Sequence, residues 1–102
     1  YKGEPDIHLE ILESVRKFTD IPLVLHGCTG MKEEIIREAI RMGVAKINFG
    51  TQVRCNYIQY LKEGLAANQD EGHAWKLSSY AESRLREDIK DIIRLAGSEG
   101  RV

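Results

Sequence analysis

Two short apolar runs interrupt the amphipathic segments of this chain. They cover residues 23–26 and 44–49, and each stops abruptly in polar, glycine-containing sequence. A short, almost wholly apolar run is typical of a parallel strand that is covered on both faces. Each run therefore predicts a short buried strand.

Helical periodicity marks the sequence around these strands. Apolar residues recur at three- and four-residue spacing, which predicts helices over 6–18, 31–42, 51–67 and about 75–96, with a loop over 68–72. The apolar stripes of the four helices are Ile7, Ile11, Val15 and Phe18; Ile35, Ile36, Ala39 and Ile40; Val53, Tyr57, Leu61 and Leu65; and Leu85, Ile89, Ile92, Ile93 and Ala96. Gly43 suits the end of the second helix.

The alternation of helices and short strands indicates an α/β fold with parallel strands. Both strands end in residues with possible chemistry, which matches the active-site edge of a (β/α)8 barrel, where a phosphate site often follows strands seven and eight. Two strands alone do not make a stable sheet. The chain also opens on Tyr1 rather than Met. We therefore expect residues 1–102 to be one segment of a longer barrel and not an independent domain.

Composition narrows the class of protein. The 102 residues carry a formal charge of −1, and 42% are hydrophobic and 30% charged, which favours a soluble globular protein. No basic excess indicates nucleic-acid binding, and no apolar run is long enough to span a membrane. Cys28 and Cys55 lack metal-type spacing, and no signal peptide is recognisable, so we expect free thiols and a cytoplasmic location.

The first strand ends in a possible metal ligand and a possible anion site. His26 offers a neutral imidazole that can bind zinc or act as a base, or it is simply hydrogen-bonded at the strand end. The turn over 27–30 offers backbone N–H groups and the Thr29 hydroxyl to an anion, or it is an ordinary turn in which Thr29 caps locally. Cys28 is a weak candidate for a reactive thiol, since only His26 could serve as its base.

The second strand delivers polar groups to the same edge. The Asn48 amide can donate to a substrate oxygen, and Gly50 and Thr51 can hold a phosphate; the alternative is that Thr51 caps the helix and Asn48 is a turn residue. Lys46 shares a strand face with Asn48, which favours an ion pair in the barrel interior over a Schiff-base lysine. Outside this edge, His8 and His73 are surface or packing residues, and the charges of the last helix form a solvated face with i,i+4 pairs.

The two motifs together resemble a known family. Residues 26–30 and 43–51 resemble the last two strands of the class II, zinc-dependent ketose-bisphosphate aldolases, which include fructose- and tagatose-bisphosphate aldolases. Residues 95–100 are similar to that family's C-terminus, and the similarity is strongest over 22–54. The resemblance implies that the chain is the C-terminal portion of a TIM barrel: about its last two βα units plus a terminal helix.

The resemblance also implies roles for single residues. His26 would be one of three histidine ligands of Zn²⁺, and Asn48 would contact the reacting end of the substrate. Gly27 and Thr29 would help to bind a monovalent cation, Na⁺ or K⁺, together with the substrate phosphate. The other members of the phosphate cradle would be Cys28, Gly30, Phe49, Gly50 and Thr51. The family more often has Gly at the position of Cys28 and Ser at that of Thr29, so a left-handed backbone at Cys28 is in question.

The implied reaction is reversible aldol cleavage of fructose or tagatose 1,6-bisphosphate to dihydroxyacetone phosphate and glyceraldehyde 3-phosphate, as in glycolysis and related carbohydrate metabolism. Zinc would serve as the Lewis acid. The general base and two zinc ligands would lie outside this chain, which alone would be inactive. The full-length enzyme would be a homodimer or homotetramer.

Other interpretations stay open at this point. The barrel could bind phosphate without a metal, or the chain could belong to a non-catalytic, aldolase-like partner subunit. A self-contained flavodoxin-like or Rossmann-type phosphate binder is disfavoured, because only two strands and no G-x-G-x-x-G motif are present.

Overall fold

Every predicted helix and strand is present in the computed structural model, which describes residues 8–67 and 73–101. The elements follow the order α1 (Leu9–Phe18), β1 (Leu23–Leu25), α2 (Glu33–Arg41), β2 (Val44–Ile47), α3 (Thr51–Ala67) and α4 (Ala74–Leu95). Residues 6–7, the predicted start of the first helix, lie outside the described residues, and so does the predicted loop over 68–72. The strands stop one and two residues earlier than their apolar runs.

The two strands pair in parallel, as predicted. Leu23 pairs with Val44, Val24 with Lys46 and Leu25 with Ile47. The hydrogen bonds continue past the strand ends: the Asn48 N–H donates to the Leu25 carbonyl over 3.0 Å, and the Cys28 N–H donates to the Asn48 carbonyl over 3.2 Å. The two segments that follow the strands are thereby held side by side.

Only one face of this small sheet is covered within the described residues. The core includes Ile36 and Ala39 of α2 and Val44 of β2, all buried. Val24 is 46% exposed, and Lys46, its partner in the sheet, is also exposed. The prediction of strands covered on both faces is therefore wrong for the described part, because no described element packs over the face that carries Val24.

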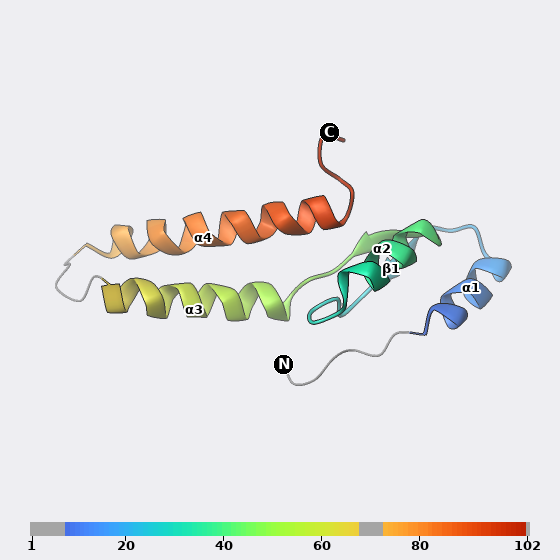
Figure 1. Cartoon of the computed structure of the whole chain (residues 1–102), viewed down its shortest axis with the longest axis horizontal. Coiled ribbons are helices and arrows are strands. Elements are labelled where there is room, and N and C mark those ends of the chain that lie inside the picture. Colours follow the sequence, from blue (N-terminus) through green and yellow to red (C-terminus); the bar gives the residue numbers. More distant parts are fainter. Residues whose placement is uncertain (1–7, 68–72, 102) are drawn as a thin grey trace.

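Helices α3 and α4 form a long antiparallel hairpin that extends away from the strands (Figure 1). Small residues let the two helices approach closely. Gly64 is buried, and a Cβ atom there would lie 2.7 Å from Leu77 Cδ1; Ala81 on the opposite helix is fully buried. The predicted stripe of α3 is only partly buried, since Leu65 at its end is 57% exposed.

Helix α1 lies apart from the hairpin, beyond the strands (Figure 1). Its predicted apolar stripe is exposed, with Ile11 at 59%, Val15 at 40% and Phe18 at 90%. The radius of gyration is 17.4 Å, whereas a compact domain of about this length has about 13 Å. In the described part of the chain, no helix combines the length and apolarity that crossing a membrane requires.

Candidate functional site

The ends of β1 and β2 bring two predicted site residues into contact. Asn48 Nδ2 lies 3.0 Å from His26 Nδ1, although the two residues are 22 positions apart in the sequence. The amide N–H donates to Nδ1 when that nitrogen carries no proton, so the contact suits a neutral imidazole. His26 is exposed and Asn48 is half-buried. An accessible imidazole and an amide therefore share one edge of the sheet.

The turn after His26 takes its unusual backbone from two glycines. Gly27 has φ 71° and Gly30 has φ 76°, and no other residue type has a positive φ anywhere in the described ranges. The question about Cys28 is thereby answered: it occupies an ordinary backbone conformation between the glycines. A side chain at this position is compatible with the turn.

Cys28 is a buried packing residue within this turn. It is 1% exposed, and its thiol donates to the Leu25 carbonyl over 3.6 Å. Burial raises the pKa of the Cys28 thiol, and a backbone hydrogen bond from Asn48 offsets part of that shift. A buried thiol with a raised pKa is a poor nucleophile, so the reactive-cysteine interpretation loses its support.

One threonine hydroxyl joins the turn to the start of α3, and a second lies within the first turn of that helix. Thr29 Oγ1 accepts a hydrogen bond from the Gln52 backbone N–H over 3.0 Å, so it ties the two strand-end segments together rather than capping its own helix. Thr51 is the first residue of α3, and its Oγ1 accepts from Arg54 Nη2 over 3.3 Å. Because the Gly50 carbonyl accepts the helical bond from the Arg54 N–H, Gly50 is the N-cap and the prediction of Thr51 as the cap is wrong.

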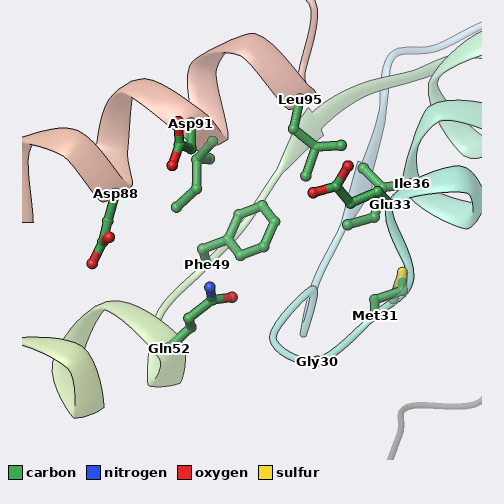
Figure 2. Close-up of a pocket in the computed structure, with 10 residues that line it drawn as sticks. Gly30, Met31, Glu33, Ile36, Phe49, Gln52, Asp88, Asp91 and Leu95 are labelled. Carbon is green, nitrogen blue, oxygen red and sulfur yellow. The ribbon is translucent and has the colours of Figure 1, made fainter.

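A pocket of about 350 Å³ lies beside this edge, between the start of α2 and the C-terminal half of α4. Figure 2 shows the Phe49 ring inside it, facing Leu95. Neither His26 nor Asn48 lines this pocket, although Phe49 directly follows Asn48 in the sequence. The structure thus places Phe49 in a pocket of mixed apolar and acidic lining, and its predicted role in phosphate binding stays a prediction.

The sequence profile described as "Fructose-bisphosphate aldolase class-II" matches residues 1–101. The chain belongs to the class-II fructose-bisphosphate aldolase family. The resemblance stated from residues 26–30 and 43–51 is confirmed.

Individual members of the aldolase family agree with this assignment. The chain is 37% identical over 98 residues to the "Probable fructose-bisphosphate aldolase" of Bacillus subtilis (strain 168), covering 96% of this chain and 34% of that protein. The crystal structure of the YdjI aldolase from Escherichia coli K12 superimposes with a TM-score of 0.74 at 31% identity, covering 95% of this chain and 36% of that one. The chain spans about a third of the length of these two aldolases.

The described residues of this aldolase-family chain offer one accessible imidazole at the strand ends, not a whole metal site. Zinc sites in proteins use three or four nitrogen, sulfur or oxygen ligands. Within residues 8–67 and 73–101, no group of three or more His, Cys, Asp or Glu side chains is placed to hold a metal ion. The accessible His26 ring suits one ligand of a site completed by side chains from elsewhere.

Sequence reasoning missed Gln52 and Arg54, which contact the two threonines. The available signal was their position in the first turn of α3, directly after Gly50. Lys46 is exposed and makes no ion pair with the described residues, so its partner in a barrel interior stays a prediction. His8 and His73 are exposed, as expected.

Proposed function

We propose that this chain is the C-terminal part of a zinc-dependent (β/α)8 aldolase that reversibly cleaves fructose or tagatose 1,6-bisphosphate to dihydroxyacetone phosphate and glyceraldehyde 3-phosphate. The observation that carries the proposal is the 3.0 Å contact between His26 and Asn48 at the ends of adjacent parallel strands. Membership of the class-II aldolase family supports the reaction class. The name of the Bacillus subtilis relative supports a ketose bisphosphate as the substrate.

The open face of the sheet supports placing it in a barrel. Val24 and Lys46 are paired and exposed, and His26 and Asn48 follow them by two positions, directly after the strand ends. In a closed (β/α)8 barrel, such a face points inward and its carboxyl end forms the mouth of the active site. The missing strands of the barrel would come from the rest of a longer polypeptide.

His26 would hold the metal together with ligands from earlier strands. Bound zinc supplies Lewis-acid polarisation of the substrate carbonyl. Asn48 would donate its amide N–H to an oxygen at the reacting end of the substrate. The contact with His26 keeps this amide at the metal-binding edge, ready to orient the substrate.

The two strand-end turns would hold the substrate phosphate. Backbone N–H groups at helix starts and threonine hydroxyls are donors suited to an anion. A Cβ atom added at Gly27 or Gly50 would meet no heavy atom within 4 Å, so the space beside both turns is open. Gly27 and Thr29 would also bind Na⁺ or K⁺, and Gly30, Thr51 and the Cys28 backbone would complete the cradle.

The zinc content of the full-length protein tests the role of His26. We expect about one zinc per chain in the wild type by elemental analysis, and loss of that zinc in His26→Ala. His8→Ala is the matched control, because His8 is exposed at the N-cap of α1 and its loss should leave the zinc content unchanged. A wild type that takes up no zinc when zinc is offered would contradict the proposal and favour a metal-independent phosphate-binding barrel.

The reaction itself is tested by cleavage assays with both bisphosphates, with and without a chelator. We expect activity that a chelator abolishes and added zinc restores. Activity that resists the chelator would contradict the zinc mechanism. Absence of activity with both bisphosphates would favour a non-catalytic partner subunit.

A further inference from the structure

The two threonines of the cradle are already engaged as hydrogen-bond acceptors. Thr29 Oγ1 accepts from the Gln52 N–H over 3.0 Å, and Thr51 Oγ1 accepts from the Arg54 guanidinium over 3.3 Å. A hydroxyl has one hydrogen, and an N–H that approaches the oxygen turns that hydrogen away from the donor. Both hydroxyls are therefore oriented to donate, which suits a ligand made only of acceptor oxygens.

Arg54 adds a charge that the described residues do not neutralise. The arginines Arg37, Arg41, Arg84 and Arg94 have a carboxylate partner, whereas Arg16, Arg54, Arg86 and Arg101 have none among the described residues. Arg54 has none within the described part of the chain, and its recorded side-chain partner is the Thr51 hydroxyl. Its side chain is exposed, so the charge is accessible to a ligand.

The position of Arg54 on its helix also favours an anion beside it. The N-terminal end of a helix carries partial positive charge, which disfavours a cation in the first turn. Helix α3 has no acidic residue there to compensate, and neither does α4, whereas α1 and α2 do. A doubly charged ligand at the start of α3 would offset both the helix dipole and the guanidinium.

We propose that Arg54 is a positioning residue of the phosphate cradle that makes the site select a phosphate dianion over the monoanion. It acts through Thr51, whose hydroxyl it orients toward the ligand, and it contributes one positive charge. This inference rests on the proposed phosphate site and goes beyond it, because it assigns the charge selectivity to one residue in the first turn of α3.

The test is the affinity of the full-length protein for glycerol 3-phosphate, measured by calorimetry at pH 5 and pH 7.5. A phosphate monoester loses its second proton near pH 6, so the two pH values compare the monoanion with the dianion. We expect the wild type to bind the dianion several-fold more tightly. Arg54→Ala should lose about tenfold in affinity at pH 7.5 and little at pH 5, the loss expected of a charge-assisted hydrogen bond.

Two further variants separate charge from orientation. Arg54→Lys keeps the charge and should retain part of the preference for the dianion, whereas Arg54→Gln keeps a donor for Thr51 and should lose that preference. On a Thr51→Val background, Arg54→Ala should cost less than it does alone, because the hydroxyl on which it acts is gone. Arg37→Ala is the control, since Arg37 pairs with Glu33 on α2 and should leave the affinity unchanged.

Unchanged affinity in Arg54→Ala at pH 7.5, or equal losses at both pH values, would overturn the inference. A wild-type protein that does not bind glycerol 3-phosphate at either pH would overturn the inference too. The bisphosphate cleavage assay reports separately on the proposed function. An active enzyme whose Arg54→Ala variant binds glycerol 3-phosphate normally would refute only the role of Arg54.

Discussion

At the scale of single residues, Cys28 shows how a buried side chain fits into a turn whose left-handed positions are glycines. The left-handed conformations fall on Gly27 and Gly30, so Cys28 needs no special backbone. Its side chain fills space under the turn, where it is 1% exposed. Cys28 therefore contributes packing beneath the proposed phosphate cradle.

The burial of Cys28 predicts slow thiol chemistry. In the full-length protein we expect Cys28 to react with iodoacetamide on the order of tenfold or more slowly than the exposed Cys55, because thiolate is the reactive form and burial disfavours it. Peptide mass spectrometry measures both rates. Equal rates in the folded protein would contradict the prediction, whereas equal rates in denaturant are the control.

The same raised pKa predicts how stability depends on pH. The folded state keeps the Cys28 proton above the ordinary thiol pKa of 9.0, so this contribution is present below pH 9 and is lost as pH rises through the higher folded pKa. We expect the free energy of unfolding, measured in urea, to fall above pH 9. Cys28→Ala should show a weaker fall; an identical fall would mean that other groups cause it.

At the scale of elements, a polar network joins α3 to α4. Asp88 Oδ2 accepts from the Tyr60 hydroxyl over 2.6 Å and from Asn56 Nδ2 over 3.0 Å. The Arg84 guanidinium lies 4.9 Å from the centre of the Tyr60 ring. The hydrogen bond to Asp88 raises the pKa of Tyr60. This network fixes how the two helices lie against each other.

Removal of Asp88 should therefore weaken the hairpin. Asp88→Ala should destabilise the full-length protein by about 1–3 kcal/mol, since it leaves two donors without their acceptor. Asp88→Asn should cost less, because it retains an oxygen. Asp91→Ala is the matched control: Asp91 pairs with Arg94 on the exposed surface of α4, and its loss should cost no more than about 0.5 kcal/mol. Urea unfolding measures all three, and equal losses in Asp88→Ala and Asp91→Ala would contradict the prediction.

Local patterns predicted the elements well and their partners poorly. The periodicity of α3 gave the bounds 51–67 that the structure has, and the parallel pairing followed from the order of elements. The pairs on α4, Lys90 with Glu87 and Arg94 with Asp91, are spaced i,i+3 rather than the predicted i,i+4. The contacts of Tyr60 with Asp88 and of Thr29 with Gln52 join residues 28 and 23 positions apart, which no local periodicity indicates.

At the scale of the whole molecule, the described chain leaves apolar surface uncovered. Ile11, Phe18 and Ile21 are each more than half exposed, and Val24 is 46% exposed on the open face of the sheet. Because two parallel strands bury too little surface to be stable alone, a larger domain would have to cover these side chains.

We therefore expect residues 1–102, expressed alone, to lack bisphosphate cleavage and to unfold without a cooperative transition. The measurement is urea unfolding followed by circular dichroism, beside the full-length protein as the cooperative control. Ile11→Asp should destabilise the full-length protein by about 2–4 kcal/mol if the rest of the domain buries α1. A cooperative, monomeric transition of residues 1–102 alone would contradict this prediction.

The two left-handed glycines of the 27–30 turn have a consequence for redesign. They confine the left-handed backbone conformations to positions 27 and 30, so a side chain at position 28 needs no rebuilding of the loop, provided that it fits the buried space that Cys28 fills. Substitutions at position 28 alone would change the packing beneath the proposed phosphate cradle, while the backbone N–H donors of the turn keep their positions.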